Sequence, residues 1–510
     1  MELAWSFFVW SAGICLSVVL VLQLLQVKAR NSSRQLPPGP PRWPIVGNLF
    51  DLGKAPHRTL AGLVQKYGPV IWLQLGAVNT VVIQSTKASR ELFKNHDLTY
   101  SGRTITEVMK AGSFDQGSMA IAQYGPYWRK IKRIVVTELS GSKQFNETAS
   151  MRKRSVDKMI QWIDEEAQAK GRVCLANFVF LANCNLVGNL VLSRDLLDPQ
   201  CKEGAEFLNA MEGLMIGGGK PNVADFFPIL KWLDPQGIRK KMEKDMGHAM
   251  QIVSGFVKER IAKPQSGERK ERKDLLDVLL EQEDTREDEP DKLLERDMIS
   301  LILELFMGAT ETTSSTIEWA MTELLRDSKT MSKVRTELAQ VVGENRRINE
   351  SDIEKLPYLH AVVKETLRLH PPIPFLIPRR AVEDNNFMGY FIPMDTQVFV
   401  NAWAIGRDPD SWDDPLSFKP ERFLGSDIDY GGQHFELIPF GAGRRRCAGF
   451  TMGHTVLHLA LGSLLHCFEW ELDEPITPEN IDMEERLGIT LRKNVPLELV
   501  PKTRDVFNKK

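Results

Sequence analysis

Cys447 is the residue whose surroundings best suit chemistry, because it lies in the glycine- and arginine-rich segment 440–449. Neighbouring arginines lower the pKa of a thiol, and glycines allow a tight loop whose N–H groups can point at the sulfur. Apolar residues recur at helical spacing over residues 451–470, so Cys447 would precede a helix N-terminus, whose dipole favours an anion. The pattern predicts a thiolate that can bind a metal ion. The alternative is a buried structural cysteine on a glycine turn.

A second unusual segment, residues 308–313, reads Gly-Ala-Thr-Glu-Thr-Thr in the middle of an apolar helix predicted over residues 297–326. Glycine, a carboxylate and consecutive threonines all weaken helix formation. A local conflict of this kind indicates a functional distortion, with Glu311 and Thr312 as the polar groups available for chemistry. The alternative for Thr312 is a buried hydroxyl that is merely hydrogen-bonded.

Glu365 and Arg368 are three residues apart in a strongly helical segment, residues 357–369, so they share one face and can form a charge-assisted pair. An ordinary exposed pair would have the same spacing. The helix ends directly in His-Pro-Pro, and Arg422 follows in a Pro-Glu-Arg-Phe segment.

The pattern Phe-x-x-Gly-x-Arg-x-Cys-x-Gly, formed by Phe440, Gly443, Arg445, Cys447 and Gly449, resembles the haem-binding loop of the cytochrome P-450 monooxygenases. The resemblance implies that Cys447 is the axial ligand of the iron of haem b, where a thiolate favours O–O cleavage. It also implies that Phe440 contacts the cofactor and that Arg445 pairs with a haem propionate.

The other segments match further signatures of this family. Residues 308–313 resemble its oxygen-activation signature, which implies that Glu311 and Thr312 relay protons while O2 is activated, as polar groups in an apolar pocket can. Ala309 stands where glycine is commoner in the family. The Glu-x-x-Arg pair and the later Pro-Glu-Arg-Phe segment imply a structural role for Glu365, Arg368 and Arg422 below the haem.

Residues 127–133 resemble the family's Trp-x-x-x-Arg helix, whose Trp and Arg bind a haem propionate. Trp128 matches, but the arginine position holds Lys132, so either Lys132 or Arg133 could contact the propionate. Lysine supplies a point charge without the bidentate fork of arginine. Arg379 resembles another propionate ligand, with a solvated arginine as the alternative. The cations of residues 129–133, read as charges on a surface helix, could also meet an acidic reductase partner.

The substrate pocket is inferred by resemblance alone. Four segments of family members meet the substrate, and their counterparts here are mostly apolar, so the site should take a small lipophilic molecule. Plain core packing is the alternative for each of these residues. The predicted lining residues are Phe114, Leu305, Ala309, Ile373, Phe375 and Leu487.

Composition excludes some partners. The formal net charge is −2 and the pI is near 6.6, and no basic stripe interleaved with aromatics is present, so we expect no nucleic-acid partner. The six cysteines show no CxxC or framework spacing, so we expect no disulfides and a reducing compartment. The length of 510 residues favours two or three domains, whereas the resemblance implies one catalytic unit over residues 48–510.

Residues 3–27 carry no charge and would form a helix of about 37 Å, enough to cross a bilayer core of about 30 Å. A cleaved signal peptide is the alternative, but no small-residue cleavage site precedes Lys28. Basic residues follow the span, which places the catalytic part in the cytosol. We therefore expect a membrane anchor with a basic flank over residues 1–30 and a proline-rich hinge over 31–47. The resemblance implies a single-pass protein of the endoplasmic reticulum membrane.

The hydrophobic periodicity predicts a mainly α fold with a minor β part, and the resemblance implies the cytochrome P-450 fold with an N-terminal transmembrane helix. Residues 281–297 are heavily charged and are expected to form a solvated loop. The predicted strands are 70–75 and 80–83, with strand-like segments over 387–400, and the remaining predicted helices are 155–167, 241–262 and 330–342.

The whole set of motifs resembles plant microsomal members, in particular the groups of geraniol hydroxylase and iridoid oxidase. This implies hydroxylation of a terpenoid in secondary metabolism, with O2 and with electrons from NADPH through a separate cytochrome P-450 reductase. The substrate could instead be an alkaloid, a phenylpropanoid or a fatty acid. Other classes are a haem-thiolate isomerase or dehydratase, which usually lacks the acid–threonine pair, and a haem-binding protein without turnover.

Overall fold

The computed structural model of this chain describes residue 10 and residues 35–197, 210–211, 213–262, 273–281 and 293–504. Apart from residue 10, the predicted membrane span over residues 3–27 lies outside the described residues, as do its basic flank and the first part of the hinge. Within the described part, α9 (Leu175–Leu192) is the one helix long and apolar enough to cross a membrane. It is 72% buried and packs against the long helix α14 (Glu295–Arg326), so it is a core helix.

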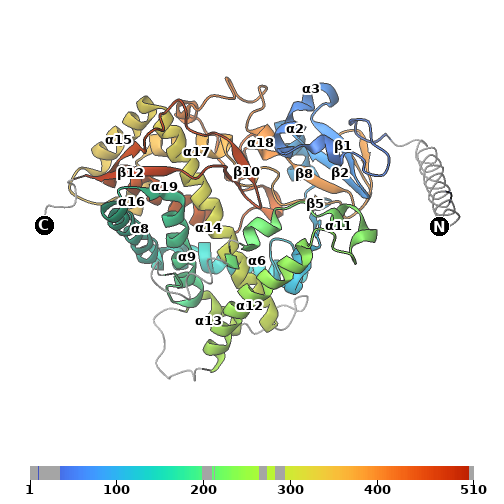
Figure 1. Ribbon diagram of the computed structural model, residues 1–510, viewed down its shortest axis with the longest axis horizontal. Helices are drawn as coiled ribbons and strands as arrows, with labels where there is room; N and C mark the ends of the chain where they lie inside the picture. Colours follow the sequence, from blue (N-terminus) through green and yellow to red (C-terminus); the bar gives the residue numbers. More distant parts are fainter. Residues whose placement is uncertain are drawn as a thin grey trace, which may run out of the picture.

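Helices make up most of the described chain, and α14 runs through the middle of them (Figure 1). The prediction of a mainly α fold with a minor β part is confirmed. Besides α9 and α14, the helices are α2 (Pro56–Gly62), α3 (Val64–Tyr67), α4 (Thr86–Asn95), α5 (Phe114–Gly117), α6 (Pro126–Ser140), α7 (Ser142–Glu147), α8 (Ala149–Lys170), α11 (Val223–Phe226), α12 (Ile238–Ala262), α13 (Leu275–Glu281), α15 (Ser328–Val342), α16 (Glu350–Ile353), α17 (Pro357–Leu369), α18 (Ala402–Ile405) and α19 (Phe450–Cys467), with 3-10 turns η1 (Leu49–Leu52), η2 (Val108–Ser113), η3 (Pro228–Leu230), η4 (Pro420–Phe423) and η5 (Gly443–Arg445).

The largest sheet lies beside α2 and α18, at one side of the helical part (Figure 1). Its strand order is β1-β2-β8-β5-β3, and only β2 and β8 pair in parallel. Three smaller sheets are β4-β12-β9, β10-β11 and β6-β7. The strands are β1 (Val70–Leu75), β2 (Val78–Ile83), β3 (Gly102–Arg103), β4 (Val173–Cys174), β5 (Arg379–Arg380), β6 (Asn385–Phe387), β7 (Tyr390–Ile392), β8 (Gln397–Val400), β9 (Phe468–Leu472), β10 (Glu485–Leu487), β11 (Leu491–Lys493) and β12 (Glu498–Thr503).

Helix α19 is shorter than the periodicity predicts. The sequence favoured a helix through residue 470, but α19 ends at Cys467 and β9 begins at the next residue. Phe468 and Trp470 are buried and Glu469 between them is exposed, and this alternation is typical of a strand with one buried face. Val500 and its neighbours in β12 supply the ladder partner, a long-range contact that a local pattern cannot reveal.

Helix α14 passes through the polar segment 308–313 without a break, so the distortion expected there is absent from its secondary structure. Thr310 donates a hydrogen bond to the Phe306 carbonyl at 2.8 Å, and Thr312 donates to the Gly308 carbonyl at the same distance. These hydroxyls bond back to the preceding turn, which accommodates threonines inside a helix.

Glu365 and Arg368 form a fully buried pair near the end of α17. The Arg368 guanidinium donates two hydrogen bonds of 2.7 Å to the Glu365 carboxylate, and both side chains have 0% exposure. Arg422 of η4 adds a third contact through Nε, 3.0 Å from Glu365 Oε1. The remaining Arg368 N–H groups donate to the carbonyls of Gly406 and Pro415, each at 2.6 Å. This network joins α17 to the loops that lead toward the Cys447 segment.

Replacing Arg368 by methionine should lower the free energy of unfolding by about 3–5 kcal/mol, because the Glu365 carboxylate would stay buried without its bidentate partner. Lys333→Met is the matched control, since Lys333 pairs with Glu421 at the surface and should cost less than about 1 kcal/mol. Urea unfolding of the two variants measures both changes, and equal losses would contradict the structural role of the Arg368 pair.

Candidate active site

The Cys447 loop is tied tightly to the protein before α19 begins. The Cys447 N–H donates to the Phe440 carbonyl at 3.0 Å. Gly441 and Gly443 have φ angles of 68° and 67°, in the left-handed region that favours glycine. A Cβ on Gly443 would lie 2.5 Å from Asp97 Oδ1, so this turn also needs a residue without a side chain.

The three arginines before Cys447 point away from the sulfur. Arg444 pairs with Asp97 at 3.2 Å, Arg445 donates to the carbonyls of Ser101 and Ala122 at 2.9 and 2.7 Å, and Arg446 donates to the Gly431 carbonyl. Burial raises the pKa of the Cys447 thiol, although the Gly449 N–H, Lys132 and Arg446 oppose this rise. The arginines and loop N–H groups that were predicted to make Cys447 a thiolate are therefore outweighed by its burial. A bound metal ion would deprotonate it, as metals do for coordinating thiols.

Cys447 borders a space enclosed by protein. Its side chain keeps accessible surface, yet protein surrounds it closely enough that burial dominates its pKa. A side chain can have both accessible surface and dense surroundings when it faces an internal cavity, so we infer that the Cys447 sulfur faces one. Gly308 on the central helix α14 is also exposed, and a Cβ added there would meet no atom within 4 Å. Ala309 of α14 and Ala448 of the loop pack against the same apolar cluster, so the helix and the loop border the same part of the protein interior.

Four cations gather beside this loop: Arg103, Arg379, Arg445 and Lys132. Burial lowers the pKa of Arg103 and Arg379, and it lowers the pKa of Arg445 to about 10 and of Lys132 to about 8. Repulsion within the group adds to this effect, because Arg445 acts on both Arg103 and Lys132. Buried like charges are stable only when anions compensate them. The four cations therefore fit the two carboxylates of a haem, and the Cys447 thiol fits as a ligand for its iron.

The structure places each predicted propionate residue. Arg379 is buried, with Nη1 2.9 Å from Asp97 Oδ1, so the solvated alternative is wrong. The Trp128 indole donates to the Met119 carbonyl at 2.9 Å, and the Arg445 guanidinium lies 4.6 Å from the Trp128 ring centroid. Lys132 donates to the carbonyls of Arg444 and Arg446 beside Cys447. It is therefore Lys132 that joins the cation group.

The cations of α6 do not all lie on a surface. Lys130 is only 1% exposed, which contradicts the prediction that residues 129–133 present their charges on a surface helix. Helix α6 is amphipathic, with Ile131, Ile134 and Val135 buried. Lys130 lies one residue from this apolar face, where a long aliphatic stem can be buried.

Glu311 is held by the hairpin β10-β11 region rather than being free. The Thr490 hydroxyl donates to Glu311 Oε2 at 2.5 Å, and Arg492 Nη1 lies 2.8 Å from Oε1. The Glu311 side chain is 6% exposed and that of Arg492 is 27% exposed. This pair connects the carboxylate on α14 to a residue that reaches solvent.

Glu304, which sequence reasoning missed, links α14 to the loop before α6. Its carboxylate accepts hydrogen bonds from Ser118 and from the backbone N–H groups of Met119 and Ala120. Burial raises the pKa of Glu304 to about 7. Arg103 donates through Nε to the Ala120 carbonyl of the same loop at 2.8 Å. No spacing rule marks Glu304, because its partners belong to a loop far away in sequence.

The predicted pocket residues separate into groups. Phe114, Leu305 and Ala309 belong to one apolar cluster, which also contains Ile377. Phe375 instead packs on Phe399, with ring centroids 5.0 Å apart, in a different cluster beneath the main sheet. Ile373 and Leu487 are half-buried.

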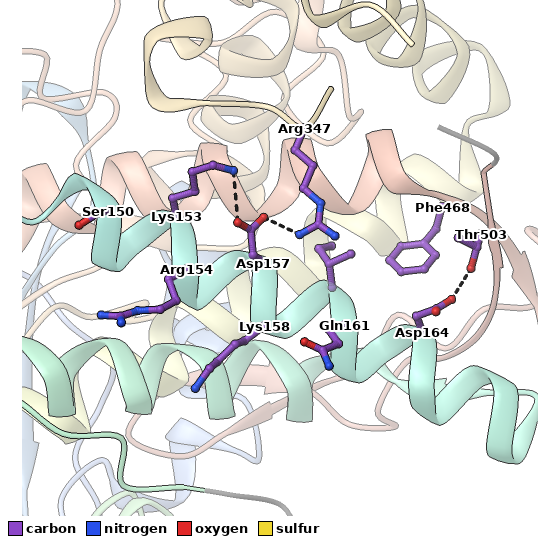
Figure 2. Close-up of a pocket in the computed structure, with 11 residues that line it drawn as sticks. Ser150, Lys153, Arg154, Asp157, Lys158, Gln161, Asp164, Arg347, Phe468 and Thr503 are labelled. Carbon is purple, nitrogen blue, oxygen red and sulfur yellow. Dashed lines mark hydrogen bonds and ion pairs between the residues drawn. The ribbon is translucent and has the colours of Figure 1, made fainter. Parts of the chain in front are cut away.

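A groove of about 500 Å³ lies along α8, and Figure 2 shows its polar side chains. Lys153 and Arg347 point toward Asp157, with N–O distances of 3.2 and 2.8 Å. None of the predicted site residues lines this groove. It is therefore separate from the region around Cys447.

Comparison with known proteins agrees with this geometry. The sequence profile of the family described as Cytochrome P450 matches residues 37–499. An iridoid oxidase of Catharanthus roseus is 51% identical, covering 95% of this chain and 96% of that protein. A geraniol 8-hydroxylase of the same plant is 41% identical, covering 96% and 99%. A zebrafish cytochrome P450 solved with progesterone has a TM-score of 0.75 and 26% identity, covering 88% of this chain and 99% of that one.

Arg379→Met should lower haem retention by about tenfold or more, because a charge-assisted hydrogen bond contributes about 1.5–3 kcal/mol. The neighbouring Arg380 is the matched control, since it pairs with Asp395 and its side chain is 35% exposed. Arg380→Met should change haem retention by less than about twofold. Transfer of haem to apomyoglobin measures the dissociation rate. Equal rates for the two variants would contradict an anion-binding role for the buried cations.

Proposed function

Because this chain belongs to the cytochrome P450 family and is a monooxygenase, we propose that it inserts one oxygen atom from O2 into a C–H bond of a terpenoid. The likeness to iridoid oxidase and to geraniol 8-hydroxylase extends over nearly the whole chain. It confirms the plant subgroup predicted from the sequence and supports a monoterpenol or an iridoid as substrate. The apolar cluster that contains Phe114, Leu305 and Ala309 suits such a lipophilic molecule.

The family implies a haem-thiolate cofactor, and we propose that it is haem b with Cys447 as its axial ligand. When bound, the haem supplies the chemistry of O2 activation, and a thiolate ligand favours O–O cleavage. The chain's own part is to hold this group: Arg103, Lys132, Arg379 and Arg445 supply positive charge for its carboxylates. The loop with Gly441 and Gly443 fixes the sulfur in one place.

We propose that Glu311 and Thr312 move protons toward the space beside Gly308. Glu311 pairs with Arg492, whose side chain is 27% exposed, so the carboxylate lies near solvent water with which it can exchange protons. Thr312 is adjacent on α14 and half-buried, with its hydroxyl held by the Gly308 carbonyl. A proton relay needs groups in this order, from solvent to the reacting atoms.

Electrons would come from NADPH through a separate cytochrome P450 reductase, a partner that the family implies. We propose that the chain is anchored in the endoplasmic reticulum membrane by residues 3–27, with residues 48–510 as the catalytic domain in the cytosol. The uncharged sequence of this segment and the basic residues after it support this proposal.

The observation that carries the proposal is the combination of Cys447, the buried cations and the open space beside Gly308 in one region. Membranes that contain this protein and a reductase should convert monoterpenols or iridoids in an NADPH-dependent reaction. A panel that also contains alkaloids, phenylpropanoids and fatty acids tests the substrate class. Turnover of only these other compounds would contradict the terpenoid assignment, and product formation without NADPH would favour an isomerase or dehydratase.

Cys447→Ser should abolish the strongly red-shifted Soret band of the ferrous carbonyl complex, because a serine hydroxyl stays protonated and cannot replace a thiolate. Cys174→Ser is the control, because Cys174 is another free cysteine, at the β4 edge of a small sheet. It should keep the band. Difference spectra of the reduced proteins with carbon monoxide measure both, and an unchanged band in Cys447→Ser would overturn the ligand assignment.

Thr312→Ala should leave the haem spectrum nearly unchanged but lower the product formed per NADPH by about tenfold or more, with hydrogen peroxide rising, because proton relays contribute about 100- to 10,000-fold. Thr310→Ala is the matched control: it removes a hydrogen bond of equal length from the same helix, but Thr310 is fully buried. Product, peroxide and NADPH are quantified in the same reaction. Equal coupling in both variants would show that Thr312 is only a satisfied core hydroxyl.

A further inference from the structure

Three histidines outside the haem region converge on one point. His360, His454 and His458 each offer an imidazole nitrogen, and these atoms lie within 4.8 Å of one another. His454 and His458 are four residues apart on α19, so they share a face of that helix. His360 belongs to α17, which packs directly against α19 (Figure 1).

Each of these rings is oriented by a hydrogen bond between one of its nitrogens and an oxygen atom. His458 Nδ1 donates to the His454 carbonyl at 2.7 Å, and His360 Nε2 donates to the Ile353 carbonyl at 3.1 Å. His454 Nδ1 lies 2.7 Å from the hydroxyl of Tyr430. Metal-ligating histidines are held in this way, because the second hydrogen bond fixes both the tautomer and the direction of the ring.

One imidazole nitrogen of this cluster is buried without a hydrogen-bond partner. His458 is 0% exposed, and its Nε2 is buried without a hydrogen-bond partner. Leaving a buried polar atom unsatisfied costs free energy, so such an atom in a native protein calls for an explanation. A metal ion bound between the rings would supply the missing partner.

The charge of the three imidazole rings and of the groups near them is compatible with a bound cation. Burial lowers the pKa of His454 to about 4 and lowers the pKa of His360 and His458 as well, so all three rings are neutral at pH 7. The neutral imidazole is the form that binds metals. Three charged groups act on the cluster, the cation Lys364 and the carboxylates of Asp429 and Glu354, so no strong net repulsion opposes a metal cation.

We propose that His360, His454 and His458 form a Zn²⁺ site, with His360 Nδ1, His454 Nε2 and His458 Nε2 as ligands. Three nitrogen ligands leave a fourth position for water in the tetrahedral geometry that zinc prefers. Water can enter because His360 and His454 are only half-buried. Zn–N bonds of about 2.0–2.1 Å bring the nitrogens to about 3.3 Å from one another, so the rings must close by roughly 1 Å.

A metal ion at this site would join two helices of the catalytic unit. Helix α17 carries Glu365 and Arg368, and α19 begins just after the Cys447 loop. Tyr430, the partner of His454, also contacts Phe440 of that loop, with ring centroids 5.5 Å apart. Zn²⁺ should therefore stabilise the folded protein, because a ligand that binds only the native state raises its melting temperature.

Equilibrium dialysis of the untagged holoprotein against Zn²⁺, with zinc measured by mass spectrometry, tests the proposal. We expect one saturable ion per chain, and His360→Gln and His454→Gln should each weaken binding by about tenfold or more. His466→Gln is the matched control, because His466 lies on the same helix and bonds to the Arg346 carbonyl instead. It should change the affinity by less than about twofold.

A second readout is the melting temperature with and without Zn²⁺, which should rise for the natural sequence and for His466→Gln but not for the two cluster variants. The haem spectrum reports whether each variant is folded. If His454→Gln loses this spectrum, the comparison of His360→Gln with the natural sequence decides the test, because His360 is half-exposed. Absence of saturable binding up to about 0.1 mM free Zn²⁺, or equal affinity in His360→Gln and the natural sequence, would overturn the site and leave a packed histidine cluster.

Discussion

Positive charge concentrated inside the protein is the constraint on which the rest of the site depends. Arg103, Arg379 and Arg445 are withdrawn from water, and burial lowers the pKa of each of them. Asp97 and Glu304 are the carboxylates that act on this group, and Asp97 also holds the glycine turn at Gly443. A cofactor with two carboxylates would balance the charge, so the cations, the turn and the cofactor stabilise one another.

The loop after α5 connects this charge to the central helix. Its carbonyls accept hydrogen bonds from Trp128, Arg103 and Arg445, and its N–H groups donate to Glu304 of α14. The same stretch of chain carries Phe114, which packs in the apolar cluster with Ala309. One backbone segment thus contacts both the cation group and the proposed substrate pocket, so a change in either should affect the other.

The sequence predicted local features well and long-range partners poorly. The bounds of α17 and β1 follow from periodicity, and the Glu365–Arg368 pair follows from its spacing. The directions of Arg444 and Arg445 could not be predicted, because their partners lie more than 300 positions away. The contact of Glu311 with Arg492 could not be predicted either, since Arg492 belongs to a hairpin and lies 181 residues further along the chain. Tertiary contacts of this kind leave no periodic signal.

We propose that the enclosed region between Cys447 and α14 performs monooxygenation of a terpenoid. The most direct test is mass spectrometry of the product that the protein and its reductase form from a monoterpenol or iridoid under ¹⁸O2. If the inserted oxygen comes from O2, each hydroxylated product should carry one labelled oxygen atom. It should carry none when the label is supplied as H2¹⁸O. A product that carries oxygen only from water, or an isomerised product without new oxygen, would contradict this proposal.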